Sequence, residues 1–88
     1  MIGDEDLLTR ARAVFRIVFE DPAFELQPGL KMGAIEAWDS FNQINLMLGL
    51  ETEFGIEFDH QEMAELLAVE AIIAAVERRL GGQRSMHS

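Results

Sequence analysis

Few side chains in this sequence could perform chemistry. The two histidines, His60 and His87, lie far apart along the chain, and the sequence contains no cysteine. The usual combinations for metal binding, or for a nucleophile with a paired base, are therefore not assembled. Ser40 stands out by its position, because it follows Asp39 at the predicted start of a helix. The sequence thus argues against an enzyme and directs attention to this helix start.

Ser40 also has a purely structural interpretation. Serine is a common N-cap residue, and Ser40 with Gln43 three residues later fits the capping box, which satisfies free amide groups at a helix start. A cap of this kind needs no further function. The residues alone leave both interpretations of Ser40 open.

The helices that must position Ser40 can be predicted from the spacing of apolar residues. Helical periodicity is present in three segments, residues 4–19, 40–54 and 69–80. A brief helix is expected over 60–65, and a long loop with apolar anchors such as Trp38 joins the first two helices. The prediction is an all-α, small four-helix bundle with three main helices, one short helix and a long loop between helices one and two.

The predicted helix over 40–54 carries two apolar stripes. The first stripe, which should face the core, consists of Leu46, Met47, Leu50 and Phe54. The second, named here the Phe41 stripe, consists of Phe41, Ile44 and Leu48. So small a bundle is not expected to bury both sides of one helix, so the Phe41 stripe is a candidate partner-binding surface. The alternative is that the long loop covers it.

The end of the last helix sets the expected domain boundary. Gly81 and Gly82 are predicted to cap this helix, which gives one domain over 1–82 and a flexible tail over 83–88. The acidic N-terminus and the lack of a long apolar run predict neither secretion nor membrane insertion. A cytoplasmic monomer is the corresponding expectation.

The charge of the chain constrains its partners. Sixteen acidic and seven basic residues give a formal net charge of −9, and residues 32–77 contain no Lys or Arg. Such a charge repels nucleic acid and attracts basic protein surfaces, although it also serves solubility. We therefore expect protein partners and no nucleic acid.

The residues around Ser40 resemble a known family. Trp38-Asp39-Ser40-Phe41 is similar to the Asp-Ser-Leu signature of acyl and peptidyl carrier proteins. The similarity continues from Leu50-Glu51 to Phe58, which resembles the LExEFGIxF run of that family, and in helix order it covers residues 4–80. The chain departs from the family where Phe41 replaces a frequent leucine and where Asn42 and Asn45 replace acids common on that helix.

The resemblance implies a free-standing carrier protein that is not an enzyme. In such a protein 4′-phosphopantetheine is attached covalently to the serine, here Ser40 with Asp39 as its motif neighbour, and its thiol carries acyl or aminoacyl groups as thioesters. The two asparagines favour a dedicated pathway in fatty acid or secondary-metabolite biosynthesis. The residues alone also allow a helical protein-interaction module with no prosthetic group.

The resemblance also implies the partners of the chain. They are a phosphopantetheinyl transferase and acyl- or aminoacyl-loading and transfer enzymes with basic docking surfaces. The predicted partner-binding residues are those of the Phe41 stripe and four acids: Glu51, Glu53, Glu57 and Asp59.

Overall fold

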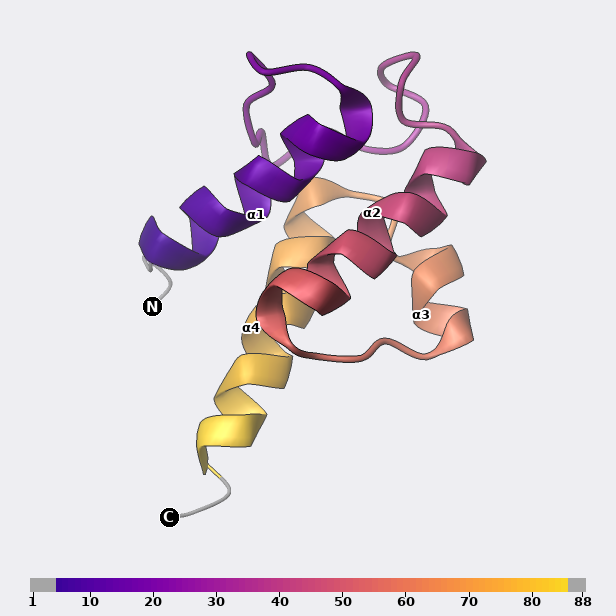
Figure 1. The fold of residues 1–88 in the computed structure, drawn as a ribbon. Helices are drawn as coiled ribbons and strands as arrows, with labels where there is room; N and C mark the ends of the chain where they lie inside the picture. The colour runs from indigo at the N-terminus through magenta and orange to yellow at the C-terminus, as the bar shows by residue number, and fades with distance from the viewer. Residues whose placement is uncertain (1–4, 86–88) are drawn as a thin grey trace.

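The computed structural model describes residues 5–85 and places four helices in them (Figure 1). Their bounds are α1 Glu5–Phe19, α2 Ser40–Phe54, α3 His60–Glu65 and α4 Val69–Ser85. In Figure 1, α1 and α2 lie in front of α4, and the short α3 lies to the side of α2. The only β-type pairing in the described part of the chain is an isolated bridge between Lys31 and Ala68. The predicted all-α architecture is confirmed.

Four aromatic rings hold the long loop against α1. Phe15 and Phe19 come from α1, and Phe24 and Trp38 come from opposite ends of the loop. The Phe15 ring stacks on Phe24 with centroids 5.4 Å apart and meets Trp38 edge to face at 5.9 Å. All four side chains are buried. Because offset-stacked and edge-to-face pairs are the favoured ring geometries, this aromatic cluster fixes both ends of the loop.

Backbone hydrogen bonds fix the middle of the loop to the start of α4. The amide of Met32 donates to the carbonyl of Leu67 at 2.7 Å, and the amide of Val69 donates to the carbonyl of Leu30 at 2.9 Å. The loop is therefore attached to α1 by aromatic packing and to α4 by hydrogen bonds. The expectation that this loop packs over the core is confirmed.

A glycine and an ion pair determine how α1 packs on α2. A Cβ atom added at Gly49 would lie 2.9 Å from Cγ1 of Val14, so only glycine permits this approach. At the other end of the contact, Arg10 Nε donates to the Glu53 carboxylate at 2.7 Å, and the guanidinium lies 4.6 Å from the ring centroid of Phe54. The pKa of Arg10 is raised above its ordinary value, chiefly by the hydrogen bond to Glu53.

The predicted glycine cap at the end of α4 is wrong. The helix continues through Gly81 and Gly82 to Ser85, and Gly81 does not adopt the left-handed conformation that a glycine cap requires. Glycine in a helix interior costs only about 1 kcal/mol relative to alanine, so it does not oblige a helix to end. The predicted tail over 83–88 thus begins inside α4, and its last residues, 86–88, lie outside the described residues.

Of the four helices in residues 5–85, none combines the length and the apolar character that crossing a bilayer requires.

Candidate functional site

Asp39, and not Ser40, is the N-cap of α2. Asp39 has an extended backbone, and its carboxylate oxygen Oδ1 accepts a hydrogen bond from the amide of Asn42 at 2.9 Å. The predicted capping box of Ser40 and Gln43 is therefore wrong. Aspartate caps helices as well as serine does, and here it lies one residue earlier, so Ser40 becomes the first residue of the helix.

This arrangement leaves the Ser40 side chain available. Ser40 is exposed, and its hydroxyl forms no hydrogen bond with any residue in the described range 5–85. The side chain of Asn42 donates to the carbonyl of Ala37 at 2.8 Å and so ties the first turn of α2 to the preceding loop. A fixed helix start therefore presents an uncommitted hydroxyl to solvent.

Gln43 has a role that the sequence analysis missed. Its side chain is 3% exposed, and its Oε1 accepts a hydrogen bond from Trp38 Nε1 at 2.8 Å. Its Nε2 donates to the carbonyls of Met63 at 2.9 Å and Leu66 at 2.8 Å. The signal for this burial was present, because Gln43 lies three residues before Leu46 and continues the core stripe by one turn.

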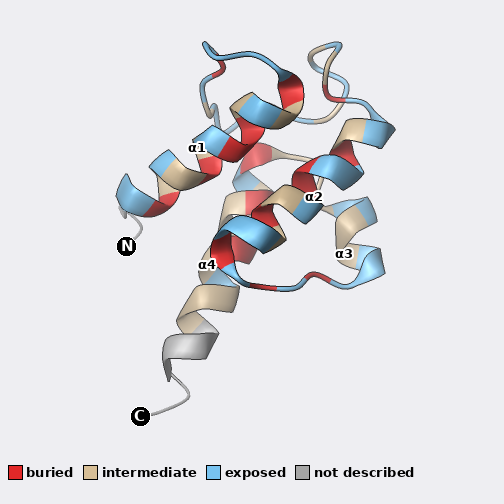
Figure 2. Ribbon diagram, viewed as in Figure 1, coloured by how far each residue is buried: buried red, intermediate tan, exposed pale blue. Residues whose placement is uncertain are grey.

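The two stripes of α2 differ in exposure as predicted (Figure 2). The first stripe is buried, with Phe54 the most exposed member at 8%. In the Phe41 stripe, Phe41 is 74% exposed, Ile44 43% and Leu48 46%. The alternative that the loop covers this stripe is therefore wrong. Its role in binding partners stays a prediction.

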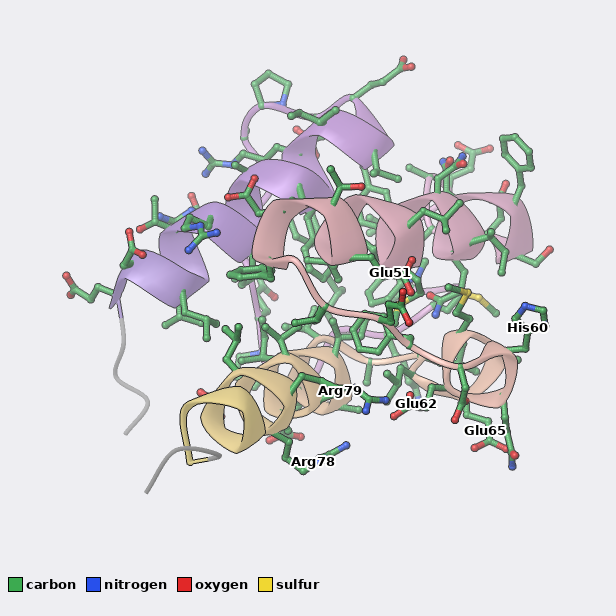
Figure 3. The ribbon with its side chains drawn as sticks, turned by 60° about the horizontal axis from the view of Figure 1, so that its bottom comes forward. Glu51, His60, Glu62, Glu65, Arg78 and Arg79 are labelled. Carbon is green, nitrogen blue, oxygen red and sulfur yellow. The ribbon has the colours of Figure 1, made fainter. Side chains whose placement is uncertain are left out.

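Three of the four acids predicted to bind partners have partners within the chain. The half-buried carboxylate of Glu51 accepts from the amide of Phe58 at 2.7 Å and is directed toward the segment between α2 and α3 (Figure 3). Glu53 is paired with Arg10, and Asp59 is the N-cap of α3 in a reciprocal capping box. Of these four acids, Glu57 alone is exposed and has no partner within residues 5–85. The role of these acids in binding partners stays a prediction.

The structure assembles no metal site from the described residues, in which no group of three or more potential metal ligands occurs. His60 is an exposed residue at the start of α3, and its side chain points away from the bundle (Figure 3). His87 lies outside the described residues.

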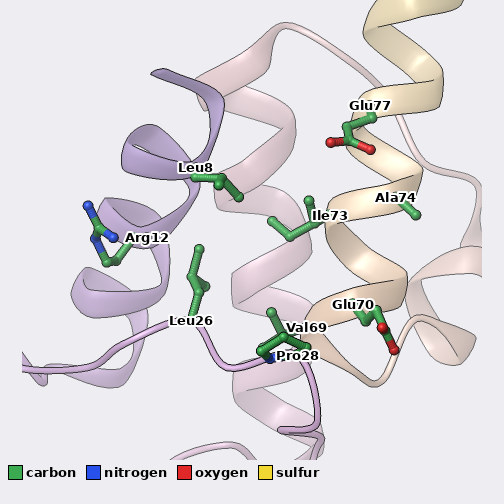
Figure 4. Close-up of a pocket in the computed structure, with 9 residues that line it drawn as sticks. All are labelled: Leu8, Arg12, Leu26, Pro28, Val69, Glu70, Ile73, Ala74 and Glu77. Carbon is green, nitrogen blue, oxygen red and sulfur yellow. The ribbon is translucent and has the colours of Figure 1, made fainter. Parts of the chain in front are cut away.

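A separate apolar cleft of about 470 Å³ lies between α1, the loop and α4 (Figure 4). Its lining includes Leu8, Leu26 and Ile73. None of the residues that line it belongs to the site predicted from the sequence. The cleft and the Ser40 region are thus distinct features of the molecule.

The comparisons with known proteins identify the family. No family model and no curated protein matches the chain. A solved structure does match: the solution NMR structure of the holo acyl carrier protein from Geobacter metallireducens is 30% identical, with a TM-score of 0.79. The match covers 92% of this chain and 93% of that one. The chain therefore belongs to the acyl carrier protein family, whose members are carriers and not enzymes.

Proposed function

We propose that Ser40 carries a covalently attached 4′-phosphopantetheine group, on which the chain presents acyl or aminoacyl thioesters to biosynthetic enzymes. The observation that carries this proposal is the uncommitted, exposed Ser40 hydroxyl at the first residue of α2. Because Asp39 supplies the cap, modification of Ser40 removes no hydrogen bond that the helix start needs. The same proposal treats the chain as a cytoplasmic monomer.

The backbone around Ser40 suits an attached phosphodiester. Among the described residues, no hydrogen bond occupies the amides of Ser40 and Phe41, the first two in α2. Free amides and the helix dipole make the N-terminus of a helix favourable for a negative charge. These two amides are therefore the groups that would face the phosphate, while the covalent bond to Ser40 keeps the phosphopantetheine attached.

The composition of the chain suits a carrier of thioesters. The attached group supplies a thiol, which the sequence otherwise lacks. With no cysteine in the chain, no internal thiol competes for the acyl group, and the single lysine, Lys31, precedes the segment that contains Ser40. Tethering also raises the local concentration of the thioester at a docked enzyme, to about millimolar for a short flexible link.

The Phe41 stripe is the proposed contact for partner enzymes. It begins at the residue after Ser40 and stays exposed over two turns of α2. Residues 40–50 of that helix contain no charge, so the stripe offers partners an apolar surface. Acids such as Glu57 lie beyond the stripe, where basic docking surfaces of partners would meet them. This neutral helix start favours a dedicated pathway.

Intact mass spectrometry tests the assignment of Ser40. Wild type and Ser40→Ala are incubated with coenzyme A and a phosphopantetheinyl transferase. We expect wild type to gain the mass of one phosphopantetheine group and Ser40→Ala to gain none. Ser85→Ala is the matched control, since it removes a serine at the end of α4 and should be modified like wild type. Modification of Ser40→Ala would overturn the assignment, and an unmodified wild type would favour an interaction module.

A further inference from the structure

We propose that Gln43 is a positioning residue for the modification of Ser40. It holds α3 against the start of α2, so that the transferase meets Ser40, the Phe41 stripe and α3 as one preformed surface. This inference rests on the function proposed for Ser40. It adds a residue that touches neither the hydroxyl nor the attached group.

The side-chain carbonyl oxygen of Gln43 and its NH2 group are both hydrogen-bonded. Its carbonyl oxygen accepts from the Trp38 indole, and its amide group donates to the carbonyls of Met63 and Leu66. Gln43 is the only polar side chain among the buried residues of the described chain. An apolar replacement would leave the buried Trp38 indole and two partly buried carbonyls without these partners, and a buried group left unpaired is costly.

The position of α3 depends on these bonds because the helix has few other anchors. It has six residues, none of them fully buried, and its apolar contact with the core comes from the partly buried Met63. A helix this short is not stable by itself in water. On the side toward α4, Glu62 pairs with Arg79 (Figure 3). On the side toward α2, the Gln43 amide holds the carbonyls of Met63 and Leu66, which lie at the end of α3.

The same side chain also spans the modification site. Trp38 lies two residues before Ser40 and is fully buried in the aromatic cluster. Gln43 lies three residues after Ser40. The hydrogen bond from Trp38 Nε1 to Gln43 Oε1 therefore joins the residues on either side of Asp39 and Ser40. Loss of Gln43 should loosen the loop before Ser40 and release α3 from the helix after it.

Steady-state kinetics of the transferase test this role, with the apo protein as the varied substrate. Gln43→Leu should raise the KM for the carrier by about tenfold or more, the scale set by one unpaired buried polar group. The kcat should change little, since Ser40 and the reacting groups are intact. Trp38 is the only tryptophan, so its fluorescence reports the lost indole bond directly. Hydrogen exchange should rise in α3.

Two further variants separate positioning from stability. Val76→Ala removes buried volume in α4 without touching the hydrogen bonds of Gln43, so it should lower stability and leave KM unchanged. Gln43→His can accept from Trp38 through one ring nitrogen and donate to one carbonyl through the other. We expect its KM to lie between those of wild type and Gln43→Leu.

The outcomes distinguish this inference from the function on which it rests. A wild-type protein that is not modified contradicts the proposed function. A modified wild type together with an unchanged KM for Gln43→Leu overturns the positioning role alone. If Gln43→Leu does not fold, Gln43→His decides, because an unchanged KM and unchanged exchange in α3 would show that the lost bond to α3 has no effect on recognition.

Discussion

The aromatic cluster beside α1 and the short helix α3 are held in place by opposite means. The cluster consists of buried rings, such as Phe15 and Trp38, that contact one another across α1 and the loop. In contrast, α3 has no fully buried residue, and besides the partly buried Met63 it is held by Gln43 and by the pair of Glu62 with Arg79. Apolar burial supplies most of the stability of small domains, whereas a hydrogen bond can be exchanged for one with water. We infer that the first region supplies most of the stability, whereas the position of the second rests on a few polar contacts.

The largest effect is expected from a substitution that disrupts the aromatic cluster. Phe15 is fully buried and touches Phe19, Phe24 and Trp38, so Phe15→Ala should lower the free energy of unfolding by about 3–5 kcal/mol. Denaturant titration followed by tryptophan fluorescence measures this loss. Phe41→Ala is the matched control, since the same side chain is 74% exposed there and its removal should cost about 0.5 kcal/mol or less. Equal losses would contradict the comparison.

Local signals were sufficient to predict most of the frame around that cluster. The bounds of α2 and α3 follow from neighbouring residues: two capping residues, Asp39 and Ser40, mark the start of one helix, Gly55 ends it in a left-handed conformation, and Asp59 starts the next. The periodicity of α2 also predicted which stripe is buried and which is exposed. These features depend on residues within a turn or two of each other, which a sequence displays directly.

The interactions that the sequence did not predict join distant residues or depend on a choice between equal candidates. Arg10 and Glu53 are 43 positions apart, and the Gln43 bonds to α3 span 20 and 23 positions. No periodic pattern reports such pairs. Asp39 and Ser40 are both good N-cap residues, so only the backbone geometry decides between them. The candidate serine was predictable, but the surroundings that position it were not.

A smaller effect is expected at the cap of α3. Asp59→Ala removes the side chain that accepts from the Glu62 amide at 2.8 Å, which should cost about 1 kcal/mol. Because α3 has no buried residue, hydrogen exchange should rise over the whole helix. The equivalent change in α2, Asp39→Ala, should raise exchange only in the first turn, since a buried stripe holds the rest of that helix. If hydrogen exchange in α2 rose over the whole helix as well, the buried stripe of α2 would not hold it more firmly than α3 is held.

The Phe41 stripe should separate recognition from stability on a single helix. Ile44 is 43% exposed, so Ile44→Ala should cost less than about 1 kcal/mol while it weakens transfer reactions with partner enzymes. Leu50→Ala, on the buried stripe, should cost about 2–5 kcal/mol. Denaturant titration and the rate of thioester loading measure the two properties. A large loss of stability in Ile44→Ala would place the stripe in the core instead.

The smallest effect concerns electrostatic steering of partners. Salt shortens the reach of a charge from about 10 Å at 0.1 M to about 3 Å at 1 M, so association with a basic partner should slow as salt increases. Glu57 is exposed and unpaired within residues 5–85, so Glu57→Gln should flatten this salt dependence slightly and change stability by no more than about 0.5 kcal/mol.

Glu53→Gln is the variant with which the salt dependence of Glu57→Gln is compared. It removes the same charge but also weakens the bond from Arg10 that joins α1 to α2, so it should lower stability as well. Stopped-flow association of the holo protein with its loading enzyme, measured across that salt range, gives the slopes for both variants and wild type. If Glu57→Gln leaves the slope unchanged and the wild-type rate is itself indifferent to salt, the acidic surface serves solubility, and recognition rests on the Phe41 stripe and α3.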